Sequence, residues 1–284
     1  MNSKSIFKKS LMVAACSAAL ACFSTGATAQ VFPDFTVTEG NPASTPGAFP
    51  LSFTADKITG NYVEVITFGP GNTFQVSLRW NAGQYVANNG VTPVVSNLGA
   101  SDPANPFANQ YGLYALFTAS GTFAPGPGGT TSFTFNPGGG SSLQVFTDPS
   151  TNTLFTAPAS GAAPWTTANA GDDILIATGA ALAGAGTLDP SLPTCGPGGG
   201  INCGSFGTTT SFALTAAGST LFTAPIPFYN LSFQSGQLNN FTVAGTQTIN
   251  GSLDVVFGTV PEPATLGLLG VALAAFGLAR RRRT

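Results

Sequence analysis

The chain of 284 residues contains no histidine. This absence excludes the Ser–His–Asp and Cys–His arrangements of nucleophilic catalysis, and metal sites that depend on imidazole ligands. Charged residues are also scarce, at 7% of the chain. Solubility must therefore come from serine, threonine, asparagine, glutamine and glycine. Such a surface suits hydrogen bonding to neutral polymers, and it also occurs in secreted scaffolds.

Basic residues are nearly absent from the middle of the chain. Between residues 30 and 258, Lys57 and Arg79 stand against ten acidic residues, which leaves a formal charge of −8. An acidic segment without basic patches repels phosphate backbones, so nucleic acid is not an expected partner. The glycine-rich stretches 138–140 and 198–200 lack the Lys-Ser/Thr of a phosphate-binding loop. No cofactor and no metal are expected.

Cysteine is rare as well. Cys195 and Cys203 are the two cysteines between residues 30 and 258, and glycine-rich sequence separates them. In an oxidising compartment this short loop can close as a disulfide, with free thiols as the alternative. A zinc site would need further cysteine or histidine ligands, which the segment lacks.

The first 29 residues have the pattern of a secretory signal peptide. Lys4, Lys8 and Lys9 precede an apolar stretch at 11–23, and the small residues Ala27 and Ala29 indicate cleavage before Gln30. Cys16 ends a sequence that resembles a lipobox, but the apolar stretch before it is too short. Export by a signal peptide is the favoured interpretation, and a lipoprotein is the alternative.

The other end combines three features in a fixed order. Pro261, Glu262 and Pro263 are followed by an uncharged run at 264–279, and then by the basic residues Arg280, Arg281, Arg282 and Arg283. The run would form about 24 Å of helix, slightly short of a bilayer core of about 30 Å. Arginine side chains can lengthen such a span by snorkelling, and they keep their end cytoplasmic. We expect a single transmembrane helix here.

Together these features resemble the PEP-CTERM sorting tail of bacterial proteins associated with exopolysaccharide. The resemblance implies that an exosortase, a membrane cysteine protease, processes the tail near Pro261-Glu262-Pro263 and releases the protein to the cell surface or extracellular matrix. The inner membrane is then a transient partner. A permanent membrane anchor is the alternative, but it leaves the Pro-Glu-Pro unexplained.

Residues 30–258 are predicted to form one all-β domain. Phe74, Val76, Leu78 and Trp80 alternate with polar residues and should face the core. Other predicted strands are rich in β-branched and aromatic residues: 34–38, 50–54, 62–68, 91–95, 111–123, 131–135, 143–146, 153–156, 174–178, 211–215, 221–223, 229–233, 241–244 and 246–257. Residues 147–153 are predicted to form a hairpin turn, and the Ala/Gly-rich stretch 177–188 is ambiguous. Many short strands favour an antiparallel β-sandwich, with a jelly roll or other open barrel as the alternative.

The candidate catalytic residues are carboxylates. A glycosidase needs two of them flanking a cleft, and Glu39, Glu64, Asp172 and Asp173 are the candidates. The sequence gives no separation between them, and we expect the protein not to be an enzyme. Asp172 and Asp173 could also contribute to a Ca²⁺ site, although an exposed acidic turn before the strand at 174–178 accounts for them more simply.

A second resemblance concerns the domain itself. The stretches 32–37, 111–117, 172–176 and 241–248 are similar to those of flocculation-associated PEP-CTERM proteins. This resemblance implies a secreted, non-enzymatic protein that associates with extracellular polysaccharide and promotes flocculation or biofilm cohesion. It implies no catalytic residues.

Overall fold

The computed structural model describes residues 32–40, 52–99, 111–138, 140–196, 200 and 202–258. The predicted signal peptide (1–29), with Ala27, Ala29 and Gln30, and the predicted sorting tail (259–284) lie outside these residues. The elements are β1 (Phe35–Thr38), β2 (Ser52–Ala55), β3 (Lys57–Gly69), β4 (Thr73–Ala87), β5 (Thr92–Pro93), β6 (Gly112–Pro125), η1 (Pro127–Gly129), β7 (Thr131–Phe135), β8 (Ser142–Asp148), β9 (Leu154–Thr156), β10 (Thr166–Ala168), β11 (Ile174–Gly179), β12 (Ala181–Leu188), β13 (Gly204–Thr210), β14 (Ala213–Leu214), α2 (Ala216–Leu221), β15 (Phe222–Ala224), β16 (Asn230–Ser235), β17 (Thr246–Ser252) and β18 (Asp254–Gly258).

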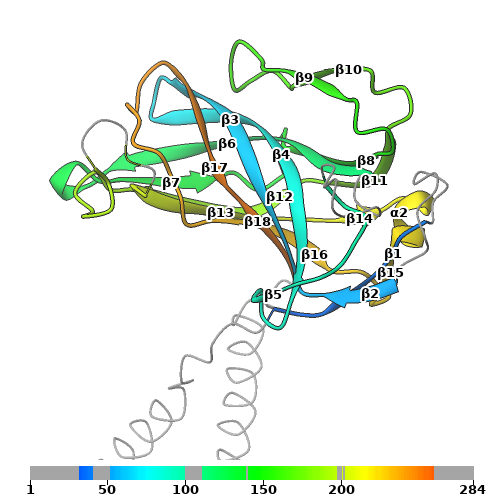
Figure 1. Ribbon diagram of the computed structural model, residues 1–284. Helices are drawn as coiled ribbons and strands as arrows, with labels where there is room; N and C mark the ends of the chain where they lie inside the picture. The colour runs from blue at the N-terminus through cyan, green and yellow to red at the C-terminus, as the bar shows by residue number, and fades with distance from the viewer. Residues whose placement is uncertain are drawn as a thin grey trace, which may run out of the picture. The chain divides into compact units, whose positions relative to one another are not determined.

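Eight of these strands form a closed antiparallel barrel. Its order is β6-β7-β12-β13-β16-β18-β3-β4, and β4 pairs back onto β6. The pairing of β18 with β3 is short, since only Val255 and Val256 face Ile58 and Lys57. In Figure 1, β3, β4 and β18 cross the view steeply, whereas β6, β7 and β13 run nearly across it.

The barrel corrects the predicted sandwich and its jelly-roll alternative. The all-β class and the antiparallel pairing were predicted correctly. Alternating apolar residues show which side of a strand is buried, but a sandwich and a barrel both bury one side. The difference lies in pairings between distant strands, such as β18 with β3, which alternation does not encode.

Three strands of the barrel carry additional strands beyond it, and in one of these pairings β4 carries the short β5. Strand β6 pairs with β8 over residues 112–118 and with β7 over 121–125, and β8 continues to β11 and β14. Gly121 lies where the partner changes. A Cβ atom there would lie 2.2 Å from the Thr134 carbonyl oxygen and 2.4 Å from Phe74 Cζ, so only glycine fits without a shift. Similarly, β17 pairs with β3.

The barrel interior is apolar and rich in aromatic rings. The predicted core positions Phe74, Val76, Leu78 and Trp80 are each at most 2% exposed, which confirms them. The Trp80 indole nitrogen donates to the Leu253 carbonyl oxygen at 2.8 Å, so its polar atom is satisfied. A separate three-stranded sheet, β15-β1-β2, lies at the lower right of the coloured part of Figure 1.

Other predicted elements differ from the structure. The Ala/Gly-rich stretch, which was ambiguous, contains strand β12, whose small residues leave space for large neighbours: a Cβ on Gly184 would lie 2.8 Å from the Phe135 ring. Residues 241–244 form no strand. The turn after β8 is not a hairpin turn, because β8 pairs with β6 and β11 whereas β9 pairs with β10.

Candidate functional site

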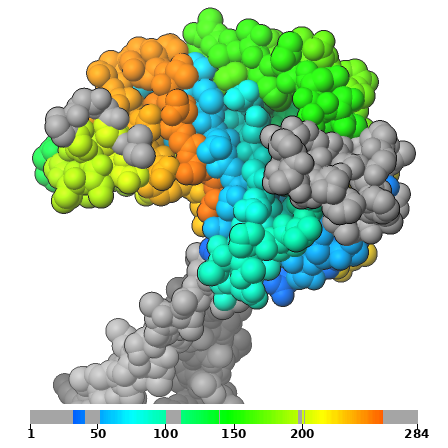
Figure 2. Space-filling model, viewed as in Figure 1, coloured from blue at the N-terminus to red at the C-terminus, as the bar shows by residue number. Residues whose placement is uncertain are grey.

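The candidate site lies on the outer side of β4. Because its apolar residues point into the barrel, Ser77, Arg79 and Asn81 point outward, and we call these three residues the covered row. Residues 149–173, between β8 and β11, fold back over this row; we call them the covering segment. It contains β9 and β10, which pair with each other, and it projects above β8 and β11 in Figure 1. In Figure 2 the same green part of the chain forms the upper margin of the visible face.

Three contacts hold the covering segment against the barrel. The Trp165 indole nitrogen donates to the Ser77 carbonyl oxygen at 3.1 Å. The Gly161 amide donates to Thr67 Oγ1 at 2.9 Å. The Arg79 guanidinium lies 4.7 Å from the Phe155 ring centre and 5.2 Å from that of Trp165, within cation–π range. Trp165 is therefore fixed in position despite lying on a long excursion.

The covered row contains three buried polar atoms without a hydrogen-bond partner in the described structure: Ser77 Oγ, Arg79 Nε and Asn81 Oδ1. Ser77 is completely buried. Burial lowers the pKa of Arg79, because the guanidinium loses solvation there. Leaving a buried polar atom unpaired costs about 1–3 kcal/mol. Three such atoms thus lie at successive outward positions of β4 beneath the covering segment.

A groove of about 680 Å³ runs beside this row. Its walls combine aromatic and polar side chains, including Ser77, Tyr114, Gln144, Phe146, Trp165 and Asp173. Tyr114 and Phe146 stack with their ring centres 5.1 Å apart. A second hollow, of about 390 Å³, is lined by Asn81, Tyr114 and Phe155 among others. Tyr114 lines both hollows, and the covered row links them.

Three carboxylates gather at the end of the groove. Asp148, Asp172 and Asp173 have oxygen atoms within 4.8 Å of one another. Asp148 accepts hydrogen bonds from the backbone of Thr153 at 3.0 Å, while Asp173 accepts from the Thr153 hydroxyl at 2.8 Å and from Tyr114. Burial raises the pKa of Asp173, and these hydrogen bonds lower it in part. Oxygen ligands of this kind suit Ca²⁺. However, the hydrogen bonds to Asp148 and Asp173 stabilise turns, and this structural role also accounts for the cluster.

The structure thus separates the predicted carboxylates. Asp172 and Asp173 lie together, and Asp148, which sequence analysis missed, joins them. Glu39 is fully buried after β1 and lines no hollow described here; burial raises its pKa, although hydrogen bonds from Asn97 and Tyr111 oppose the shift. Glu64 points into the barrel, where burial raises its pKa to about 8. The aromatic and polar residues that line the groove follow no recognisable spacing in the sequence, so sequence analysis did not identify them.

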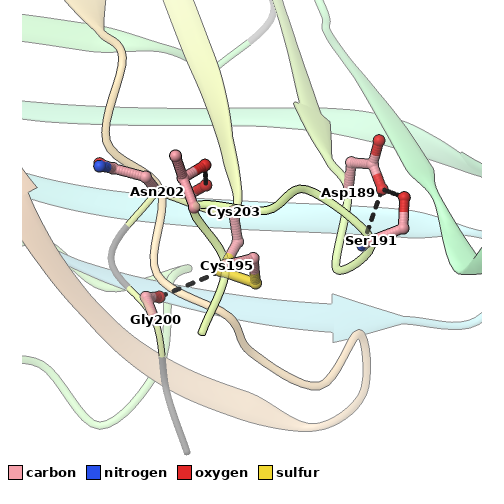
Figure 3. The surroundings of a disulfide bond; sticks show 7 residues. Asp189, Ser191, Cys195, Gly200, Asn202 and Cys203 are labelled. Carbon is pink, nitrogen blue, oxygen red and sulfur yellow. Dashed lines mark hydrogen bonds between the residues drawn. A yellow bond between two sulfur atoms is a disulfide. The ribbon is translucent and has the colours of Figure 1, made fainter. Parts of the chain in front are cut away.

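Cys195 and Cys203 form a disulfide with their Cα atoms 4.5 Å apart (Figure 3). Around it, the Asp189 carboxylate accepts hydrogen bonds from the backbone and hydroxyl of Ser191 at 2.9 and 2.6 Å. Cys203 is completely buried, and its amide donates to the Leu238 carbonyl oxygen at 2.8 Å. The bond therefore ties the loop after β12 to the start of β13, at the barrel wall.

Replacing both cysteines by alanine is expected to lower the free energy of unfolding by about 2–3 kcal/mol, because the crosslink restricts a short loop of the unfolded chain. Urea unfolding under oxidising conditions measures this loss. Reductant should produce a similar loss in the parent protein and none in the double variant. An equal response of both proteins to reductant would contradict a structural role for the bond.

Comparison with known protein families identifies one segment, at the C-terminal end of the sequence. Residues 259–283 match the PEP-CTERM protein-sorting motif. No curated protein and no solved structure matches the chain. The chain therefore carries a PEP-CTERM sorting motif, and this motif implies export, membrane-associated processing by an exosortase, and a surface or extracellular destination. Within the described ranges, no helix has the length and apolar character needed to cross a bilayer.

Proposed function

We propose that the processed protein is a non-enzymatic component of the extracellular matrix that associates with exopolysaccharide and promotes flocculation or biofilm cohesion. The sorting motif at residues 259–283 carries this proposal, because it directs the chain to an exosortase. The low charge of residues 30–258 adds support, since many weak polar contacts to a polymer require little desolvation of charge.

The contacts of the carboxylates support a binding role. A glycosidase places its two carboxyl groups on opposite sides of the scissile bond, where both must be free to reach the substrate. Here Asp148, Asp172 and Asp173 lie together, with oxygen atoms within 4.8 Å of one another. Asp148 and Asp173 also accept hydrogen bonds from the turns that they close. Glu64 is shut inside the barrel, in a small cavity with apolar walls.

Changing Pro261, Glu262 and Pro263 together to alanine is expected to abolish processing, because the exosortase loses its recognition sequence. Intact mass spectrometry of protein from the matrix and from membranes measures the outcome. The parent should yield a matrix form that begins at Gln30 and lacks the arginines. The triple variant should remain in the membrane fraction with its tail.

A matched control changes Pro33 and Asp34, outside the motif, to alanine and should leave processing intact. If the parent keeps its full tail in membranes and the triple variant behaves identically, the protein is a permanently anchored surface protein. If the matrix form degrades purified exopolysaccharide and Asp173→Asn abolishes that activity, the protein is a hydrolase. Either result would overturn the proposal.

A further inference from the structure

The groove beside the covered row has features that the sorting motif does not explain. Its walls combine aromatic rings with amide, hydroxyl and carboxyl groups. Its volume of about 680 Å³ falls in the range of roughly 300–1,000 Å³ typical of small-molecule sites. We propose that this groove binds a saccharide unit of a matrix polymer. This inference rests on the proposed function and assigns a site to it.

The polar side chains of the groove determine which chemistry fits. Ser142 and Gln144 are exposed in its wall, and together their hydroxyl and amide groups donate and accept hydrogen bonds. Such a mixture is complementary to sugar hydroxyl groups, because each hydroxyl both donates and accepts. An apolar ligand would leave these groups without partners. A strongly anionic ligand would approach Asp173 in a protein body of charge −8.

The aromatic side chains supply the second half of such a site. Tyr114, Phe146 and Trp165 line the groove, and aromatic rings contact the apolar C–H edges of a sugar ring favourably. These rings are held in place before any ligand arrives. Tyr114 stacks on Phe146 and donates to Asp173, and the Trp165 indole is hydrogen-bonded to β4. Little ordering of side chains would then oppose binding.

The decisive variant is Gln144→Ala. Gln144 is exposed on β8 and lines the groove, so truncating its side chain should leave folding unchanged. Loss of a hydrogen bond from its amide to the ligand should weaken binding about fivefold to tenfold. Ser142→Ala, at another exposed position of the groove wall, should also weaken binding without affecting folding.

The control is Thr208→Val. Thr208 is 3% exposed on β13, its hydroxyl is also buried without a partner, and it does not line the groove. This variant makes a comparable deletion elsewhere and should bind as the parent does. The full-length gene and its variants are expressed in the producing cells, and the protein is purified from them. The probe is deproteinised polysaccharide from the same cells' matrix, in affinity gels and as oligosaccharides in calorimetry.

The expected result is retardation of the parent and of Thr208→Val, with weaker retardation of Gln144→Ala and Ser142→Ala. Absence of retardation for the parent, or equal binding by all four proteins, overturns the inference. Fractionation of cells separates this failure from failure of the proposed function. Protein that reaches the matrix but binds independently of Gln144 refutes the groove alone, whereas groove-dependent binding by protein that never leaves the membrane refutes the matrix role alone.

Discussion

Replacing Glu64 by glutamine is expected to raise the free energy of unfolding by about 3 kcal/mol at pH 7 and to change it little at pH 4. Glu64 lies in β3, and its side chain points into the barrel, where it lines a cavity of about 20 Å³. The other residues of this cavity are apolar and include Ile66, Phe74 and Phe133. Burial disfavours the carboxylate there and raises its pKa from 4.5 to about 8.

The direction of the effect follows from the protons that each state binds. In the unfolded chain Glu64 ionises near its ordinary pKa of 4.5, whereas in the folded protein it stays neutral up to about pH 8. Unfolding therefore releases a proton between these values, and stability falls by about 1.4 kcal/mol for each pH unit across this window. Glutamine has nearly the same shape and no proton to release, so the variant lacks this contribution to the slope.

Urea unfolding of parent and variant at pH 4, 5.5, 7 and 8.5 measures the difference. The two curves should coincide at pH 4 and diverge steadily until about pH 8. Asp34→Asn is the matched control, because it makes the same change from carboxyl to amide at an exposed position. Equal slopes for the parent and Glu64→Gln would show that Glu64 is ionised in the folded protein, in contact with solvent.

Glu64 also illustrates what sequence analysis could predict and what it could not. The strand around it was predicted from its β-branched and aromatic residues, and the structure places residues 62–68 within β3. The same pattern cannot show that a carboxyl group at the middle of the strand faces inward, because a strand is predicted equally well whether its one charged residue lies on the buried or on the exposed side. That side is fixed by the pairing of β3 with both β4 and β17.

The barrel and the groove were beyond prediction for a related reason. Local alternation in β4 correctly indicated that Trp80 is buried. However, the groove forms where Ser77, Phe146 and Trp165 meet, and these residues belong to β4, β8 and the covering segment. Contacts between residues so far apart in sequence depend on the order of the strands in the sheet, and the local sequence pattern does not encode this order. The small residues of β12 were ambiguous because they fit between larger neighbours and have no strong strand propensity of their own.

Glu39 should respond to substitution in the opposite direction from Glu64. Its carboxylate is fully buried, but it accepts hydrogen bonds from the backbone N–H of Asn97 at 2.9 Å, from the side-chain amide of Asn97 at 2.7 Å and from the Tyr111 hydroxyl at 2.8 Å. These bonds connect the end of β1 to the chain before β6. Glu39→Ala removes this shared acceptor and leaves a cavity, so we expect a loss of about 4 kcal/mol.

Glu39→Gln tests whether the hydrogen bonds, rather than the volume, carry this stability. Glutamine fills the same space but keeps one acceptor oxygen and places an amide where the second carboxylate oxygen accepted bonds. Glutamine relieves the burial that raises the pKa of Glu39, but we expect the donors left without an acceptor to outweigh this relief, with a net loss of about 1–2 kcal/mol at pH 7. Urea unfolding with an unchanged dependence on denaturant measures this loss. The same chemical change would then destabilise the protein at Glu39 and stabilise it at Glu64, because donors surround one carboxyl group and apolar walls surround the other. Stabilisation at both positions would mean that burial outweighs the hydrogen bonds at Glu39 as well.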